Sequence, residues 1–285
     1  MNNPKRHHYI PRMLLKHFVD ERGNLYCFDR DSRDRCVTRR NPKTLFTFRH
    51  LYSFHKLDGE RDYSTEEDFL RAIENKASPI VEKIVCNARK AELSYLTPDE
   101  NSVWVEFFFT LWKRLPALRD SSASSQLRSE QNQQWYREIK GIADGEAIDF
   151  YEMEEFLKQE AWPRAIPETN ELMETRILPT LRRMSLCVVI VEKEQSGFVI
   201  GSNPIVKALP HLDLDHPEVE IWTPLAHDVA VVFRHGRPDE LYYATDEFIQ
   251  RLNERVFEQS KEIAGRSREQ IKSLKLNYSN LDRST

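Results

Sequence analysis

The hydrophobic pattern of the chain changes near Arg183, and this change limits the fold more than any other feature. Before it, apolar residues recur at helical spacing over residues 69–84 and 103–115. After it, apolar runs such as residues 186–191 and 229–233 have the length of strands. Helices grouped ahead of strands, without regular alternation, are typical of α+β proteins. We therefore expect an α+β chain, predominantly helical, with a small antiparallel sheet in its C-terminal part.

The N-terminal part predicts a small helix and hairpin module. Pro11 is well placed to open a short helix. Residues 24–29 (NLYCFD) then alternate apolar and polar side chains, and residues 36–39 follow as a returning strand, so we expect a β-hairpin. The chain divides into three parts: this basic module at 1–62, a helical region at 63–183, and a small sheet with closing helices at 184–285. We expect the three to form one compact unit.

Several local signals mark where elements begin. Thr65 predicts the N-cap of a long amphipathic helix that reaches about residue 90. The TPDE sequence at residues 97–100 supplies a cap, a proline at the first helical position and a glutamate at the third. In the C-terminal part, we expect residues 184–191 and 197–200 to pair across a turn, and Asp246 to cap a closing helix.

Basic residues are concentrated at the N-terminus. The first 61 residues hold 14 Lys and Arg against 7 Asp and Glu, whereas the whole chain has a formal net charge of −4. This asymmetry predicts a surface for an anion or a nucleic acid; the alternative is a solvated face that pairs with the acidic body. No apolar run approaches the roughly 20 residues that cross a bilayer, and no apolar stretch follows the basic N-terminus as in a signal peptide. We expect a cytoplasmic protein that does not enter a membrane.

The segment HHYIPR at residues 7–12 is the most unusual in the chain. Its adjacent histidines, His7 and His8, offer two imidazoles for acid–base chemistry near neutral pH or for metal ligation. The basic residues that would hold a phosphate group beside them are Lys5, Arg6 and Arg12. The alternative is that one histidine hydrogen-bonds the entry to the helix while the other is exposed.

The same segment also resembles the first strand of an HNH-type ββα metal nuclease. In that reading His8 is the general base, Asn41 an orienting residue and His50 a metal ligand. The usual glycine pair is missing, a helix follows Pro11 directly, and the separation between His8 and Asn41 is long. The resemblance to this fold is therefore partial.

Further polar candidates lie in the helical region and in the sheet. Glu74 flanks the apolar face of the first long helix, from which it could reach Arg114 near the end of the second; such a pair can also be purely structural. Lys113 would add a cation for a substrate. Asn203, in a GSNP turn after a strand, could orient a substrate or hold its own loop. An acidic loop at residues 213–216 (DLDH) could bind a metal.

Several of these segments, in this order, resemble the bacterial and phage family called domain of unknown function 4238. HHYIPRMLLKHF and GNLYCFDR resemble its opening, AIENKASP its Ile-Glu segment, and FFFTLWKRLPALR its Gln-x-x-Arg-x-Pro segment. GSNPIV resembles its Ser-Asp-Asn-Pro motif, IWTPLAHDVAVVF its Pro-Leu-Ser strand and RLNERVFEQS its closing helix. This chain lacks the usual Gln and has Gly-Ser in place of Ser-Asp. The resemblance implies a shared fold whose polar motifs converge on one pocket, but no particular reaction.

Two classes of function follow as hypotheses. The first is a nuclease-like hydrolase acting on phosphodiester or phosphate-bearing substrates, in phage or mobile-element conflict, with a divalent metal as a candidate cofactor. There His8 is the general acid–base, His7 a second proton carrier or ligand, Glu74 an orienting or metal-binding residue, and Arg114 the group that stabilises developing negative charge, with Asn203 completing the set. The second is a non-catalytic regulatory module that binds nucleic acid or protein. A helical homo-oligomer is a third possibility, and the oligomeric state stays open.

Overall fold

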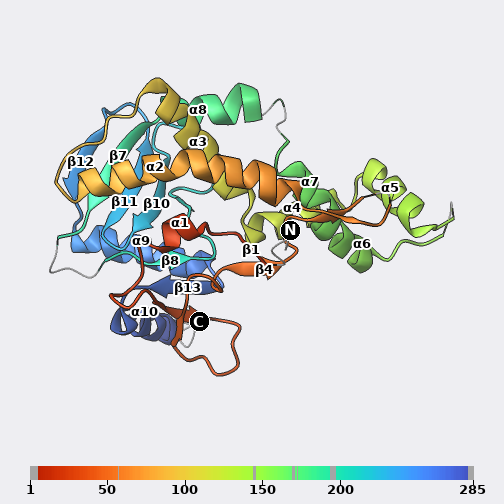
Figure 1. Cartoon of the computed structure of the whole chain (residues 1–285), viewed down its shortest axis with the longest axis horizontal. Coiled ribbons are helices and arrows are strands. Elements are labelled where there is room, and N and C mark those ends of the chain that lie inside the picture. The colour runs from red at the N-terminus through yellow and green to blue at the C-terminus, as the bar shows by residue number, and fades with distance from the viewer. Residues whose placement is uncertain are drawn as a thin grey trace.

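The long helix α2 (Arg71–Ala88) runs along the longest axis of the molecule (Figure 1) and directly continues the π-helical turn η1 (Thr65–Leu70). The predicted helix that starts at Thr65 is therefore confirmed in extent. Its predicted cap is wrong, because Ser64 occupies the N-cap position and Thr65 Oγ1 donates to the carbonyl of Pro163 at 3.1 Å. The structure is a computed structural model that describes residues 6–56, 58–143, 146–168, 171, 173–192 and 197–281.

Helix α3 (Pro98–Lys113) begins at the predicted TPDE signal. The N–H of Glu100 donates to Thr97 Oγ1 at 3.2 Å, and the N–H of Thr97 donates to Glu100 Oε2 at 2.8 Å. This reciprocal capping box satisfies two of the N–H groups that a helix start leaves unpaired. Helix α3 packs against α2 and against α8 (Leu178–Arg183), which continues the turn η3 (Met173–Ile177).

A group of short helices lies beyond the end of α2 that follows η1 (Figure 1). Its members are α4 (Pro116–Gln126), α5 (Glu130–Lys140), α6 (Phe150–Phe156), η2 (Leu157–Ala161) and α7 (Trp162–Ala165). Four of their residues form a small hydrophobic cluster of their own: Ala123, Tyr136, Met153 and Leu157. Within its described residues, the predicted helical region at 63–183 contains helices and their connections but no strand.

A five-stranded sheet covers the C-terminal end of α2. Its order is β12 (Glu240–Tyr243), β7 (Ser185–Ile190), β11 (Val229–Arg234), β10 (Glu220–Ala226) and β9 (Val206–Lys207). All neighbours are antiparallel except β12 and β7, which are parallel, so the predicted antiparallel sheet is in fact mixed. Every residue of β11 is buried, which explains why its sequence reads as a continuous apolar run rather than an alternation.

A second sheet joins the two ends of the chain. Its antiparallel order is β3 (Thr38–Arg40), β2 (Leu25–Asp29), β13 (Glu262–Gly265) and β8 (Ile200–Gly201). The β2–β3 pair is the predicted N-terminal hairpin. Because β2 pairs with β13, the predicted 1–62 and 184–285 parts share this sheet.

The predicted pairing of residues 184–191 with residues 197–200 is wrong. Strand β7 has β11 and β12 as its neighbours, whereas β8 pairs with β13 in the other sheet. The segment before β8 is held by helix α9 (Asp246–Gln259): Asn253 Oδ1 accepts the N–H of Val199 at 2.9 Å, and its Nδ2 donates to the carbonyl of Gly197 at 3.0 Å. These bonds to α9 use the backbone groups that a hairpin would need. Thr245, not Asp246, caps α9 through the N–H of Phe248.

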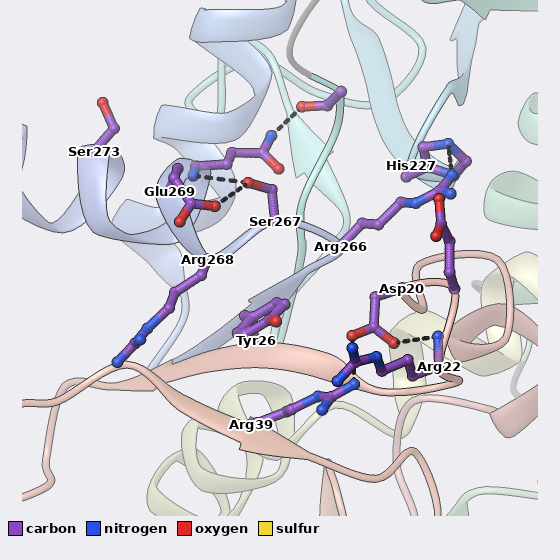
Figure 2. Close-up of a pocket in the computed structure, with 13 residues that line it drawn as sticks. Asp20, Arg22, Tyr26, Arg39, His227, Arg266, Ser267, Arg268, Glu269 and Ser273 are labelled. Carbon is purple, nitrogen blue, oxygen red and sulfur yellow. Dashed lines mark hydrogen bonds and ion pairs between the residues drawn. The ribbon is translucent and has the colours of Figure 1, made fainter.

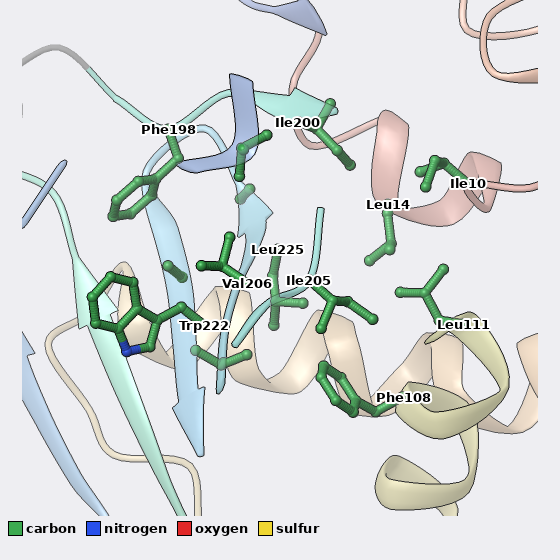
Figure 3. Close-up of a cluster of buried hydrophobic side chains, with 14 of the residues drawn as sticks. Ile10, Leu14, Phe108, Leu111, Phe198, Ile200, Ile205, Val206, Trp222 and Leu225 are labelled. Atoms are coloured by element: carbon green, nitrogen blue, oxygen red, sulfur yellow. The ribbon is translucent and has the colours of Figure 1, made fainter. Parts of the chain in front are cut away.

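One large hydrophobic cluster joins all three predicted parts of the chain. Figure 3 shows Ile10 and Leu14 meeting Leu111 from α3 and Ile205 from the loop before β9. Leu14 belongs to α1 (Arg12–Leu15). No helix in the described part of the chain is long and apolar enough to cross a bilayer.

Candidate functional site

The two adjacent histidines lie on strand β1 (Arg6–His8), which pairs with β4 (Thr47–Arg49). Successive side chains of a strand point to opposite faces, so the two imidazoles have different surroundings. His7 is fully buried, its ring is stacked on Tyr52 at 5.8 Å between centroids, and its Nδ1 accepts the N–H of Tyr52 at 3.0 Å. The backbone bond holds the residues after β4 against β1, so His7 has a structural contact within the core.

His8 is only partly buried and has a different arrangement of its ring nitrogens. Its Nε2 lies 3.0 Å from the carbonyl oxygen of Pro42. A carbonyl can only accept, so Nε2 carries a proton, and in the neutral imidazole Nδ1 then carries the lone pair. Burial lowers the pKa of His8, with further lowering by the charge of Arg12, while the Pro42 bond and the charge of Glu74 oppose the shift. The lowered pKa favours the neutral imidazole, in which Nδ1 carries the lone pair that a general base requires.

Glu74 and Arg114 are in contact, as expected from their helices. Arg114 NH1 donates to Glu74 Oε1 at 2.7 Å, and Arg114 Nε donates to the carbonyl of Tyr9 at 3.1 Å. The side chain of Arg114 is 1% exposed and that of Glu74 is 30% exposed. The pair therefore reaches from the interior to the surface, and it fixes the backbone immediately after His8. The NH2 nitrogen of Arg114 is buried without a hydrogen-bond partner in the described part of the chain, which leaves one donor available.

The structure adds Glu66, which sequence reasoning missed. Burial raises the pKa of Glu66 to about 7, the charge of Glu74 raises it further, and the charge of Arg114 opposes the rise. Glu66 lies in the π-helical turn η1, eight residues before Glu74. Because a π-helical turn changes the rotation per residue, helical spacing alone could not separate Glu66 from its acidic neighbours Glu67 and Asp68.

The predicted substrate-binding cations have different surroundings. Arg6 and Arg12 are exposed, and Arg12 is near enough to His8 to lower its pKa. Lys113 is not available in this way: its Nζ donates to the carbonyls of Ala165 at 3.1 Å, Ile166 at 2.6 Å and Glu168 at 2.6 Å. Burial lowers its pKa to about 8. Through these bonds Lys113 caps the C-terminal end of α7, and it does not face the histidines. Lys5 lies outside the described residues.

Asn203 is held by α9 and its C-terminal end. Its N–H donates to Ser260 Oγ at 3.0 Å, and its carbonyl accepts from Gln259 Nε2 at 2.7 Å. Its Oδ1 is buried without a partner among the residues that the structure describes. None of the hydrogen bonds within those residues joins Asn203 to His8, Glu74 or Arg114. The geometry supports the structural alternative, in which Asn203 holds its own loop.

The arrangement around β1 differs from a ββα metal site. Helix α1 follows β1 directly, whereas β4 comes only after β2 and β3. Asn41 Oδ1 accepts the N–H of Lys43 at 2.9 Å and so stabilises a turn. The acidic 213–216 loop is paired with η3, since NH2 of Arg176 lies 3.1 Å from Asp213 Oδ2. Across the described ranges, no group of three or more His, Cys, Asp or Glu is placed to hold a metal ion.

Comparison with other proteins places the chain by family. No curated protein and no solved structure matches it. The profile of one family, described as "Protein of unknown function (DUF4238)", matches residues 6–269. This stretch includes β1, the Glu74–Arg114 pair and the sheet that joins the two ends of the chain. The expected resemblance is therefore confirmed, and the chain belongs to the DUF4238 family.

Proposed function

We propose that this protein is a hydrolase that cleaves a phosphodiester or another phosphate-bearing substrate at a centre formed by His8, Glu66, Glu74 and Arg114. The observation that carries the proposal is the pairing of two opposite pKa shifts around one ion pair. The lowered pKa of His8 favours its neutral form, and no hydrogen bond within the described residues reaches its Nδ1, while Glu66 has a pKa of about 7. The charges of Glu74 and Arg114 act on both groups. Titratable groups whose surroundings drive their pKa values in different directions are typical of acid–base sites.

In the proposed reaction, His8 is the base and Glu66 the acid. Nδ1 of His8 takes a proton from water, and the oxygen of that water forms a bond to phosphorus. The bond between phosphorus and the leaving oxygen breaks, and protonated Glu66 gives its proton to that oxygen. Each of these proton transfers can contribute about 10²- to 10⁴-fold to the rate.

The Glu74–Arg114 pair would position this centre. Arg114 holds Glu74 and the carbonyl of Tyr9, which is the residue after His8. Its deep burial supports a positioning role over the direct charge stabilisation expected from the sequence, although its NH2 group remains a donor. Arg12, exposed beside His8, is the cation placed to attract a phosphate. A cytoplasmic location and a role in phage or mobile-element conflict are parts of this proposal that rest on the sequence.

The proposal is tested by incubating the purified protein with end-labelled DNA and RNA, with and without Mg²⁺ or Mn²⁺. The informative variant is His8→Gln, because the amide nitrogen of Gln can keep the bond to Pro42 while no base replaces Nδ1. The matched control is His211→Gln, which changes an exposed histidine elsewhere. We expect product from the wild type and the control, at least about 100-fold less from His8→Gln, and an unchanged Tm.

Two results would contradict this proposal. One is an absence of cleavage by folded wild-type protein, and the other is equal cleavage by His8→Gln. Binding of nucleic acid with a steep salt dependence, and without product, would favour the non-catalytic binding module instead.

A further inference from the structure

A cavity of about 930 Å³ opens between the start of α10 (Arg268–Leu281), the β2–β3 hairpin and the turn before it (Figure 2). Four arginines from three separate segments line it: Arg22, Arg39, Arg266 and Arg268. It contains none of the residues in the proposed catalytic centre. Its volume lies within the range of about 300–1,000 Å³ that is usual for small-molecule sites.

The cavity holds three carboxylates against four guanidinium groups, and among the described residues only Arg39 forms an ion pair with one of them. Asp20 pairs with Arg39 at 2.8 Å and also accepts the N–H groups of Arg22 and Asn24, each at 2.9 Å. Glu269 accepts the hydroxyl of Ser267 at 3.2 Å, and Glu21 is an exposed residue of the lining. Within the described residues, the guanidinium groups of Arg22, Arg266 and Arg268 form no ion pair with a carboxylate.

Arg266 is oriented by a neutral acceptor. Its NH1 donates to Nε2 of His227 at 2.9 Å, and Nδ1 of His227 lies 3.1 Å from the carbonyl oxygen of His17, to which it can only donate. This arrangement requires the neutral imidazole, and burial lowers the pKa of His227 despite the opposing charge of Asp228. Asp228 is itself held by Arg89 through two hydrogen bonds of 2.8 and 2.9 Å. The guanidinium of Arg266 is therefore positioned while its charge remains available.

The rest of the lining suits an elongated anion with an attached ring. Helix α10 begins at the cavity, and the N–H of Gln270 donates to Ser267 Oγ at 3.3 Å, which places the positive end of the helix dipole there. Figure 2 shows Tyr26 between Arg39 and Ser267, near the centre of the group. Tyr26 lies 6.0 Å from the guanidinium of Arg39 and is partly exposed. An aromatic face next to several guanidinium groups offers contacts to both a base and phosphates.

We infer that this cavity is a binding site for a nucleotide, with Arg22, Arg266 and Arg268 holding its phosphate chain. Planar guanidinium groups bind phosphate oxygens through paired hydrogen bonds. Three of them, from two segments, form no ion pair among the described residues, and they match a di- or triphosphate better than a single phosphate. The site is independent of the proposed hydrolase centre because the two share no residue. It is a place for binding, and no bond is made or broken there.

The test is isothermal titration of the full-length protein with ATP and, separately, with sodium triphosphate, both without divalent metal. The double variant Arg22→Glu/Arg268→Glu reverses two exposed charges of the cavity. The matched control is Arg33→Glu/Arg128→Glu, which makes the same charge change at two exposed arginines outside it. We expect ATP to bind the wild type, and the cavity variant to lose at least about tenfold in affinity, since charge-assisted hydrogen bonds are lost and like charges are introduced. The control should stay within about twofold, because distant exposed charges are screened.

Several outcomes separate this inference from its alternatives. ATP should raise the Tm of the wild type and of His8→Gln, but not that of the cavity variant; binding retained in His8→Gln shows that the site does not depend on the hydrolase centre. A wild type that binds neither ATP nor triphosphate overturns the inference. So does an equal loss of affinity in the control variant. Binding of a short single-stranded oligonucleotide without any binding of ATP would also overturn it, because the cavity would then serve a nucleic-acid backbone.

Discussion

The guanidinium of Arg114, at the end of α3, donates from NH1 to Oε1 of Glu74 on α2 at a distance of 2.7 Å. Through Nε the same guanidinium holds the carbonyl of Tyr9, and the backbone carbonyl of Arg114 accepts the hydroxyl of Tyr52 at 3.3 Å. Arg114 therefore joins two central helices to the strand that carries the histidines.

Replacing Glu74 should destabilise the protein, because the buried charge of Arg114 would lose its partner. Breaking a fully buried pair costs about 3–5 kcal/mol, and the partial exposure of Glu74 reduces this to roughly 2–3 kcal/mol for Glu74→Ala. Glu74→Gln keeps a neutral acceptor and should lose less. Urea unfolding measures both, with Glu67→Ala as the control. A loss for Glu74→Ala no larger than that for the control would show that the ion pair does not stabilise the fold.

The raised pKa of Glu66 should make stability depend on pH. The folded pKa of about 7 lies above the usual value of 4.5, so the folded protein binds more protons between these values than the unfolded chain does. Stability from this group is therefore present at pH 4.5 and falls as pH rises to 7, by about 3 kcal/mol at most. Glu66→Gln should gain stability relative to the wild type between pH 5 and pH 7.5, as measured by urea unfolding. The same relative gain in Glu67→Gln would argue against a special environment at Glu66.

If the proposed hydrolase activity is found, its pH profile should reflect the same two groups. Because its pKa is lowered, His8 stays unprotonated at pH values at which a histidine is usually protonated. Glu66 loses its proton near pH 7. The value of kcat/KM should therefore be highest on the acidic side of neutrality and fall above about pH 7. In Glu66→Gln the rate should be lower and this alkaline decline should disappear. An unchanged decline in that variant would exclude Glu66 as the acid.

Asn253 should be critical for stability, because its side-chain Oδ1 and Nδ2 both form hydrogen bonds with the backbone that leads into β8. It is 4% exposed, and its partners are Val199 and Gly197. Asn253→Ala leaves a buried backbone N–H without this acceptor, which costs about 2–3 kcal/mol. Asn101→Ala, which removes one exposed hydrogen bond of 3.4 Å to Arg182, should cost less than about 1 kcal/mol. Equal midpoints of denaturation for the two variants would contradict this role.

Features that depend only on residues close together in the sequence could be predicted from it. The capping box of Thr97 and Glu100 needs only four consecutive residues, and the helical spacing before Arg183 reports which face is buried. The β2–β3 hairpin needs only a turn between two strands. The contact between Glu74 and Arg114 could also be predicted from the sequence, because each residue flanks the apolar face of its helix and the two helices pack against each other.

Pairings between distant segments were decided by the tertiary structure. Strand β8 could have paired with β7 by proximity in sequence, but α9 holds the segment before β8 and the free edge of β13 accepts it. The arginine cavity joins residues from near both ends of the chain only because β2 pairs with β13. The pKa of Glu66 depends on burial and on charges from two other segments. The sequence by itself determined the helical spacing before Arg183 and the start of α3, since those signals are local hydrogen bonds and periodicities. Only the folded chain decided which edges and charges meet, because that depends on the packing of the whole core.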